Sequence, residues 1–421
     1  MEKTLIYEVY PISFMGRFGG KSALRRIKDF IPEINNLGVK YIWLCPIYFS
    51  PWFDHGYDVA DYTAIDPRLG LMDEFEELVK TAKEKYGIGI LMDLVLNHTS
   101  TYHRWFHNYP EFYYWSKTDR EDWQNLFNKS QSAWKYEPRK GEYYMHLFHE
   151  TQADLNWFPD GSEGEPNPEL IKKFQDIVDF WVEKGVAGFR LDVPQAINKD
   201  IFANYYEISL SARQDLIQMA KKVINGVFDE IRKDLYLLME CFDIDGTLCR
   251  YYYDNTPVNA IMDIVVKNAA SNGAKSFIAA AEKAFQNCPE GYAHVTESHD
   301  GPRFTTVADV RPNEAIDILF GYYDNKKFIS PQTIVIYQGQ ELGLENPDSK
   351  ILPDKKLLSL DAATKMRHEA GESLKLLRPE SRANARVKLP MKEYLRQKKS
   401  LNSCLRRQTQ VRAYKFTHYD Y

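Results

Sequence analysis

Cysteine is scarce in this chain, and its cysteines follow no metal-binding pattern. The 421 residues contain no CxxC pair and only five cysteines: Cys45, Cys241, Cys249, Cys288 and Cys404. So sparse and odd a set is typical of a reducing compartment. The first residues, MEKTLIYEVYPISF, lack an apolar core behind a basic start, so we expect no signal peptide. The prediction is a cytoplasmic protein.

Long hydrophobic runs and a basic surplus are missing as well. No window approaches about 18 consecutive apolar residues, so no membrane span is predicted. The net charge is −5, whereas nucleic-acid binding needs a concentrated basic surface. The locally basic stretch 388–412 is interpreted as a solvated helix face. We expect neither a nucleic-acid nor a membrane partner, and no oligomeric state is predicted.

Aromatic residues, in contrast, are plentiful. They make up 14% of the chain, with 28 Tyr and 8 Trp. Sugar rings have an apolar face, so carbohydrate clefts are commonly lined by such side chains. The hint is weak by itself, because many aromatic residues belong to cores.

Strand-like and helix-like runs alternate along most of the chain. Eight runs read as strands, near 6–10, 40–48, 88–96, 186–193, 234–242, 260–266, 292–296 and 333–339. Between two of them, Asp73 is interpreted as a helix cap. Later, Asn167 and Pro168 begin a second helix that Gly185 ends.

Repeated βα units predict a parallel sheet, and eight of them predict an α/β fold closed into a (β/α)8 TIM barrel. The alternative, a doubly wound open sheet, lacks a GxGxxG turn. The alternation stops over residues 99–160, which we interpret as a domain inserted after the third strand. Residues 1–98 and 161–390 would then form the barrel, and 391–421 its last helix and the remnant of a C-terminal domain.

Polar residues gather where the predicted strands end. The third strand ends in Asp93, Asn97 and His98, and the other polar ends carry Arg190, Asp192, Glu240, His299 and Asp300. Barrel active sites lie at the carboxyl ends of the strands. A single aspartate there is usually a cap or an ion pair, but four converging strand ends indicate function, because burying unpaired charge is costly.

These strand ends also carry a family resemblance. DLVLNH (93–98), GFRLDV (188–193), Glu240 in LLMECFD and SHD (298–300) resemble the four principal motifs of glycoside hydrolase family 13, the α-amylase family. QADLNW (152–157) and the segment 38–70 resemble further regions of that family. The resemblance covers roughly residues 5–345.

By this resemblance Asp192 is the nucleophile, Glu240 the general acid/base and Asp300 the transition-state stabiliser. A retaining glycosidase needs one ionised carboxylate and one protonated carboxyl about 5–5.5 Å apart. Arg190 lies on the same strand face as Asp192 and is expected to lower the pKa of that carboxyl. Glu240 stands between Met239 and Cys241, an apolar neighbourhood that suits a proton donor.

The resemblance also implies substrate-binding residues. His98 and His299 would donate hydrogen bonds to sugar hydroxyls, and Tyr57 would stack under the ring. Asp58 and Arg303 have two interpretations. They pair to close the cleft around one terminal glucose, as matching residues do in exo-acting members, or they form a structural ion pair.

Departures from the family pattern bear on metal binding. Gln195 and Ala196 replace a lysine and a histidine that many α-amylases carry, and the loop 13–24 lacks a DxNxDG calcium pattern. We therefore predict no metal site and no cofactor; calcium is possible but not predicted. His146 and His149 are interpreted as part of an aromatic strand. The motif at 298 reads SHD instead of the commoner NHD, and the C-terminal β-domain is expected to be reduced or missing.

The expected function is retaining hydrolysis of α-1,4-glucosidic bonds in malto-oligosaccharides or starch-type glucans through a covalent glycosyl-enzyme intermediate. An exo-acting α-glucosidase or oligo-1,6-glucosidase, an α-glucan transglycosylase and, remotely, a non-catalytic interaction domain are the alternatives. The inserted segment contains Trp105, Trp115, Trp123, Trp134 and Trp157. We expect it to line one side of the cleft, which would favour long substrates.

Overall fold

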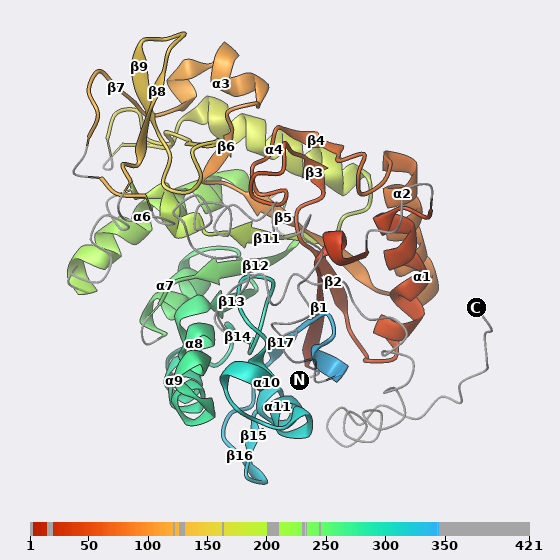
Figure 1. Ribbon diagram of the computed structural model, residues 1–421. Coiled ribbons are helices and arrows are strands. Elements are labelled where there is room, and N and C mark those ends of the chain that lie inside the picture. The colour runs from red at the N-terminus through yellow and green to blue at the C-terminus, as the bar shows by residue number, and fades with distance from the viewer. Residues whose placement is uncertain are drawn as a thin grey trace, which may run out of the picture.

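Eight parallel strands form a closed barrel in the computed structural model, as the sequence predicts (Figure 1). The structure describes residues 3–14, 20–120, 123–125, 131–161, 164–199, 210–229, 232, 234–243, 246–342 and 344. The barrel strands are β1 (Thr4–Val9), β2 (Tyr41–Leu44), β5 (Gly89–Val95), β11 (Gly188–Asp192), β12 (Tyr236–Cys241), β13 (Ala260–Asp263), β14 (Tyr292–His294) and β17 (Thr333–Tyr337). They pair in the order β1-β17-β14-β13-β12-β11-β5-β2, and β1 closes the ring on β2.

Register between the strands decides which side chains meet at the rim. Arg190 on β11 pairs with Asp93 on β5, and Asp192 pairs with Val95. On the other side of β11, Leu191 pairs with Met239, so Glu240 on β12 lies beside the end of β11. Because parallel strands share one direction, their carboxyl ends carry these charged side chains to the same edge of the barrel.

Helices surround the barrel (Figure 1). They are α1 (Ala23–Asn35), α2 (Met72–Tyr86), α4 (Pro168–Glu183), α6 (Leu210–Val227), α7 (Thr247–Asn255), α8 (Ile264–Asn268), α9 (Ala274–Asn287), α10 (Phe304–Val307) and α11 (Pro312–Leu319). Short 3₁₀ turns are η1 (Pro11–Phe14), η2 (Pro110–Phe112), η3 (Pro194–Ile197), η5 (Ala269–Asn272) and η6 (Gln340–Leu342). None of the helices described is long and apolar enough to cross a membrane.

Capping explains which element boundaries were right. The Asn167 side chain accepts hydrogen bonds from the amides of Glu169 and Leu170 at the start of α4, as predicted. The cap assigned to Asp73 was wrong, because the Glu74 side chain accepts from the Leu71 amide instead. The strand predicted over 260–266 ends early, because the Asp263 carboxylate caps α8.

Small antiparallel sheets interrupt the barrel after β2 and after β5. The first is β3 (Tyr48–Phe49) with β4 (Asp61–Ile65). The segment after β5 contains β6 (His98–Ser100), α3 (Arg104–Asn108), β7 (Trp115–Ser116), β8 (Trp134–Glu137), β9 (Glu142–Met145) and β10 (Gln152–Asp154). A hairpin of β15 (Tyr322–Tyr323) and β16 (Lys326–Lys327) precedes β17. The predicted C-terminal remnant, 391–421, lies outside the described residues.

The tryptophans of the inserted segment form a core and do not line a cleft. Trp105 is 3% and Trp157 0% exposed, and the indole of Trp157 donates to the Leu96 carbonyl oxygen of the barrel. Trp115 packs against the main core, while Trp123 and Trp134 pack on a small cluster of their own.

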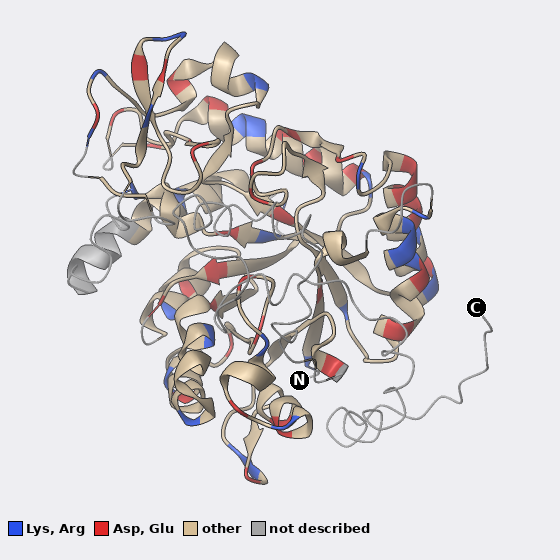
Figure 2. Ribbon diagram, viewed as in Figure 1, with Lys and Arg blue, Asp and Glu red and all other residues tan. Residues whose placement is uncertain are grey.

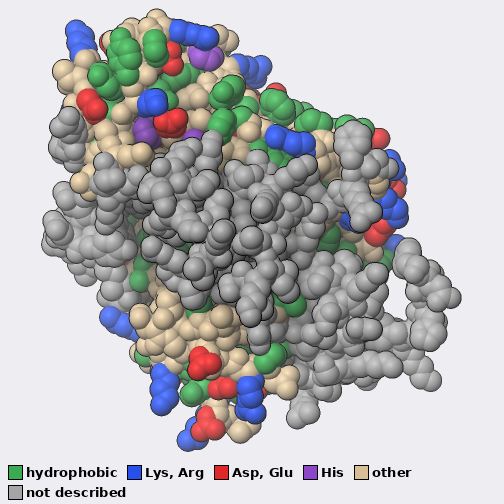
Figure 3. Space-filling model, in the orientation of Figure 1, with side chains coloured by type: hydrophobic (Ala, Val, Ile, Leu, Met, Phe, Trp, Pro, Cys, Tyr) green, Lys and Arg blue, Asp and Glu red, His purple; other side chains and the backbone are tan. Residues whose placement is uncertain are grey.

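Basic and acidic side chains are interspersed over the described part of the face that Figure 3 shows, without a broad basic area.

Candidate active site

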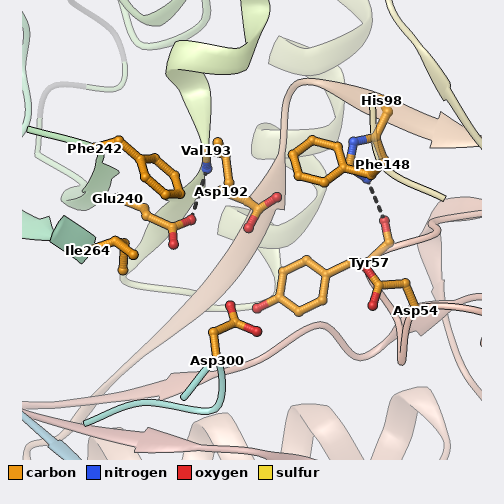
Figure 4. A pocket seen from close by; sticks show the side chains of 10 residues that line it. All are labelled: Asp54, Tyr57, His98, Phe148, Asp192, Val193, Glu240, Phe242, Ile264 and Asp300. Carbon is orange, nitrogen blue, oxygen red and sulfur yellow. Dashed lines mark hydrogen bonds between the residues drawn. The ribbon is translucent and has the colours of Figure 1, made fainter. Parts of the chain in front are cut away.

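A pocket opens at the carboxyl ends of the barrel strands. It contains about 690 Å³ of space, its open mouth included. Its lining residues are Asp54, Tyr57, His98, Phe148, Asp192, Val193, Glu240, Phe242, Ile264 and Asp300 (Figure 4). Five of them, Tyr57, His98, Asp192, Glu240 and Asp300, were predicted as site residues.

Three carboxylates point into this pocket from three different parts of the rim. Asp192 is the last residue of β11, Glu240 lies on β12, and Asp300 follows β14. Figure 4 shows their side chains directed toward one common space. The structure thus brings together the three residues expected to act on the substrate, as the converging strand ends predict.

Arg190 joins two of these carboxylates beneath the pocket. Its Nη1 lies 2.6 Å from Asp192 Oδ1 and 2.6 Å from Asp93 Oδ1, and its Nη2 lies 2.5 Å from Glu240 Oε2. The guanidinium is 1% exposed and lies 5.0 Å from the centre of the Trp43 ring. In Figure 2 the basic segment of β11 lies among acidic segments of the barrel strands. Charge-assisted hydrogen bonds of this kind fix the positions of both carboxylates.

The pKa of Asp192 differs from the sequence expectation. Burial raises it well above its usual value, and Glu240, Asp93 and Asp300 raise it further, although Arg190 acts in the opposite direction. Burial also raises the pKa of Glu240. The expectation counted only Arg190, whereas the structure surrounds one guanidinium with several carboxylates. The cluster therefore retains a proton at a pH where isolated carboxyls are ionised.

Val193 connects the two carboxylates through the backbone. It follows Asp192, adopts a left-handed φ of 37°, and donates its amide to Glu240 Oε2 at 3.2 Å. A β-branched residue rarely adopts this conformation, which costs on the order of 1–3 kcal/mol. The surrounding structure sustains this strain where the acid/base candidate needs an amide partner.

His299 is held as an imidazolium. Its Nδ1 lies 2.6 Å from Glu8 Oε1 on β1, and its Nε2 lies 3.1 Å from Asp300 Oδ2 and 2.7 Å from the Tyr57 hydroxyl. Burial lowers the pKa of His299, but the Asp300 carboxylate and the Cys45 thiol together raise it well above its usual value. Glu8 was not predicted, although it stands in a strand next to the rim.

A buried lysine accounts for the serine of the SHD motif. Lys267, which follows β13, donates from Nζ to Ser298 Oγ at 2.9 Å and to the Asp300 carbonyl oxygen at 3.4 Å. Burial lowers the pKa of Lys267, while the charges of Asp300 and Glu240 raise it. The hydroxyl of Ser298 accepts from this ammonium and also from the Asp300 amide.

The comparisons with known proteins agree with this geometry. A family model described as alpha amylase, catalytic domain, matches residues 8–404. The trehalose-6-phosphate hydrolase of Escherichia coli (strain K12) is 32% identical over 91% of this chain and 73% of its own length. The chain belongs to the α-amylase family.

Two further relatives extend the comparison. The oligo-1,6-glucosidase of Heyndrickxia coagulans is 38% identical over 49% of this chain and 38% of its own length. The crystal structure of the trehalose-6-phosphate hydrolase of Bacillus licheniformis superposes with a TM-score of 0.70 at 29% identity, covering 92% of this chain and 74% of that one. The site is that of an α-amylase-family glycoside hydrolase, and its substrate is a carbohydrate.

At the junction with the inserted segment, this α-amylase-family chain has a lysine ammonium between two oxygen ligands. Lys199 Nζ lies 2.5 Å from Asn97 Oδ1 and 3.1 Å from Asp154 Oδ2. Burial lowers the pKa of Lys199 and raises that of Asp154, so the contact between the two offsets a desolvation cost on both sides. Beside them, burial lowers the pKa of His98 to about 3, which keeps its imidazole neutral.

The expected partnership of Asp58 with Arg303 is wrong in both of its interpretations. Asp58 is fully buried and accepts hydrogen bonds from Ser50 Oγ and from the amides of Phe53 and Asp54. Arg303 is buried as well and pairs with Glu297 at 2.8 Å. Neither is among the residues that line the pocket.

Asp54, four residues earlier, occupies the position that was assigned to Asp58. It lines the pocket beside Tyr57 and His98, and its Oδ2 accepts from Gln152 Nε2 of the inserted segment at 3.2 Å. The motif FDHGYDV offered two aspartates, and the sequence does not tell which one turns inward. Asp58 holds the turn through the Asp54 amide and so positions the aspartate that reaches the pocket.

Proposed function

We propose that this α-amylase-family hydrolase is an exo-acting α-glucosidase that removes one terminal glucose from short α-1,6- or α-1,1-linked glucosides with retention of configuration. The observation that carries the proposal is the composition of the pocket on the side of the inserted segment. Asp54, His98 and Phe148 line that side, and none of the segment's five tryptophans is among the lining residues described. A pocket bounded by one carboxylate, one imidazole and one phenyl ring suits a single sugar unit better than a long glucan.

Asp192 is proposed as the nucleophile. Its carboxylate attacks the anomeric carbon and forms a glycosyl-enzyme intermediate, while the glycosidic bond to the leaving sugar breaks. Arg190 orients it through the 2.6 Å contact to Oδ1. Water then attacks the anomeric carbon from the face that the leaving sugar vacated, opposite Asp192, which breaks the bond to the carboxylate and releases α-glucose.

Glu240 is proposed as the acid that protonates the leaving oxygen and later as the base that activates water. Burial raises the pKa of Glu240, as a proton donor needs near the working pH, but it raises the pKa of Asp192 as well. The division of roles between the two carboxyls therefore rests on the resemblance to the family. Phe242 and Ile264 line the pocket near it, which keeps that side apolar. The third carboxylate, Asp300, is proposed to stabilise the positive charge that develops on the sugar ring.

Asp54 and His98 are proposed to bind the hydroxyls of the terminal glucose. Asp54 is an acceptor held by Gln152, and His98 is a neutral ring 3.2 Å from the Tyr57 carbonyl oxygen (Figure 4). Tyr57 stacks on His299, with 5.4 Å between the ring centres and 9° between their planes, and presents its ring to the pocket. Asp54 and His98 can hydrogen-bond to the hydroxyl groups at the edge of a pyranose, and the Tyr57 ring can stack on its apolar face.

The relatives support the exo-acting alternative better than the endo-acting one. Their names describe a trehalose-6-phosphate hydrolase and an oligo-1,6-glucosidase, and both act on short or terminal α-glucosides by those names. Two of the inserted tryptophans, Trp105 and Trp157, are buried, and the other three pack against hydrophobic clusters, which weakens the main argument for an extended glucan cleft. An α-amylase acting inside long α-1,4-glucans therefore becomes the second candidate.

Product analysis with a substrate panel tests the proposal. The panel is isomaltose, trehalose 6-phosphate, trehalose, 4-nitrophenyl α-glucoside and malto-oligosaccharides from maltose to maltoheptaose. We expect glucose, initially as the α-anomer, as the first product, and a kcat/KM that stays flat or falls as the malto-oligosaccharide lengthens. A rising series with maltose or maltotriose as first products would overturn exo action, and β-glucose would overturn retention. Longer products at high substrate would identify a transglycosylase.

Asp54→Asn adds a test of the terminal-glucose contact. We expect kcat/KM for 4-nitrophenyl α-glucoside to fall about 100-fold, equal to about 2.7 kcal/mol, because the amide group replaces an acceptor oxygen that sugar hydroxyls use. The control is Asp176→Asn, an exposed carboxylate of α4 paired with Lys172. Unchanged activity of the Asp54 variant would remove this residue from the glucose site.

A further inference from the structure

A second cluster of ligating side chains lies behind the pocket wall, where β12 and β13 end. Asp243 follows β12, Cys249 lies in α7 and Asp263 ends β13. One donor atom from each of the three lies within 4.8 Å of the other two, and all three residues are buried, with exposures of 0–1%. Three consecutive elements therefore deliver two carboxylates and a thiol to one buried point.

The Asp263 carboxylate does more than cap helix α8. Its Oδ1 accepts from the amides of Val265 and Val266 and from the Asp243 amide, at 2.9, 3.3 and 3.3 Å. Its Oδ2 is buried and has no hydrogen-bond partner. Among the residues that the structure describes, no lysine, arginine or histidine forms an ion pair with this carboxylate. A buried carboxylate oxygen without a partner is costly, and a bound cation would satisfy it.

A second thiol adjoins the cluster. Cys241, the last residue of β12, lies in hydrogen-bond contact with Cys249, and both side chains are 0% exposed. Neither cysteine takes part in a disulfide. Oxygen donors alone would suit calcium or magnesium, but a thiolate among them selects a borderline-soft ion such as zinc, which takes four ligands of mixed sulfur and oxygen type.

We propose that Asp243, Cys249 and Asp263 bind one divalent cation of the zinc class, with the Cys241 thiol beside this group of three ligands. Binding displaces the proton of the Cys249 thiol, so the ion is held by one thiolate and two carboxylate ligands and the proton is released to solvent.

The location gives the ion a structural task. Glu240 and Phe242 flank Cys241 in the sequence, and Ile264 follows Asp263, so each donor strand also supplies a residue of the pocket lining. A cation that ties the ends of β12 and β13 to α7 would hold the acid/base side of the pocket rigid. This role is independent of which α-glucoside the enzyme hydrolyses.

Cobalt serves as the spectroscopic probe of this site. The full-length protein, stripped of metal and reduced, is titrated with Co²⁺, while thiolate-to-metal absorption in the near ultraviolet and d–d bands in the visible are recorded. We expect one equivalent of Co²⁺ to produce both bands, one equivalent of Zn²⁺ to abolish them, and Zn²⁺ to raise Tm. Metal analysis after gel filtration gives the stoichiometry.

Two variants and two controls assign the ligands. Cys249→Ser and Asp263→Asn are expected to lose the thiolate band and the Zn²⁺-dependent rise in Tm. Cys288→Ser removes a buried thiol elsewhere and is expected to keep both. Cys45→Ser tests the other buried group of possible ligands, which comprises Glu8, Cys45 and His299, and is also expected to keep both. Circular dichroism establishes that each variant is folded.

The outcomes separate the proposal from its competitors. Absence of the bands in the folded, reduced wild-type protein would overturn it, as would bands that persist in folded Cys249→Ser. Loss of the bands in Cys45→Ser alone would move the metal to the active site and reject the cluster. A protein whose Cys241 and Cys249 resist alkylation until a reductant is added has a disulfide instead, and this too would overturn the metal site.

Discussion

Two buried cations contact β5 and the segment that follows it, Arg190 through Asp93 and Lys199 through Asn97, and the charges around them are balanced differently. Arg190 contacts oxygens of three carboxylates at 2.5–2.6 Å. Lys199 contacts one carboxylate, Asp154, and one amide oxygen, Asn97. The first cluster has more acid than base, so burial and mutual repulsion raise its carboxyl pKa values and keep a proton available. The second cluster is nearly neutral.

The difference distinguishes a cluster suited to catalysis from one suited to a structural role. A surplus of buried carboxylates is expensive, and proteins keep such a surplus where a proton must be donated or a nucleophile held. A balanced lysine–aspartate pair does no such work and instead ties the inserted segment to the barrel. The comparison therefore predicts that changes near Arg190 alter activity with little effect on folding, and that changes near Lys199 do the reverse.

The largest expected effect is on the Arg190 side. Asp192→Asn should lower kcat by about 10⁴-fold, equal to about 5 kcal/mol, because the amide cannot attack the anomeric carbon. Circular dichroism and Tm should stay close to the wild-type values, since the isosteric side chain keeps its place. Asp176→Asn on the surface of α4 is the matched control. Retention of about a tenth of the activity would remove Asp192 from the role of nucleophile.

The Lys199 side is predicted to lose stability instead. Lys199→Met leaves Asp154 buried without its cation, which should lower the free energy of unfolding by about 3–5 kcal/mol. Chemical denaturation measures the loss, and kcat of the folded fraction should change far less. Lys172→Met removes an exposed i,i+4 pair, whose partners are 65% and 58% exposed, and should change stability by less than about 0.5 kcal/mol. Equal losses in both variants would refute the contrast.

The two clusters differ in how much of them could be predicted from the sequence. The barrel, its eight strands and the convergence of Asp192, Glu240 and Asp300 were predictable, because strand periodicity and position in a parallel sheet fix which rim a residue reaches. Lys199 gave no signal, since a lysine after a turn is exposed in most proteins. Its burial depends on where the inserted segment folds back, which no local pattern encodes.

Side-chain direction in turns and loops was the weakest part of the prediction. Asp54 and Asp58 lie in one turn with left-handed residues at Trp52, His55 and Gly56, and this backbone decides which carboxylate turns inward. The pKa of Asp192 was missed for a related reason, because its carboxylate neighbours come from other strands. Aromatic composition likewise indicated a cleft in the inserted segment, whereas these rings pack into the main core and into a small cluster of their own.

Glu8 offers a smaller, sharper test of the charge balance near Arg190. Glu8→Gln removes the carboxylate that lies 2.6 Å from His299 Nδ1, so the pKa of His299 should fall. A raised histidine pKa keeps the imidazolium present to higher pH, and lowering it makes the imidazolium disappear at lower pH. We therefore expect the alkaline limb of kcat/KM to move to lower pH, with about a tenfold loss near its old midpoint. Glu77→Gln, 57% exposed, is the control. A loss of kcat/KM that is the same at every pH, without a shift of the alkaline limb, would show that Glu8 has a purely structural role.

The smallest expected effect concerns calcium at the Lys199 junction. Asn97 and Asp154 present oxygen atoms of the kind that calcium prefers, but the Lys199 ammonium lies between them, 2.5 and 3.1 Å away. A divalent ion there would meet a fixed positive charge, so binding is opposed by repulsion. Millimolar Ca²⁺ and a calcium-selective chelator should both leave Tm and kcat unchanged. A rise in Tm with Ca²⁺ that is absent from Asp154→Asn would show that the lysine moves aside, and the contrast between the two cations would then rest on Arg190 alone.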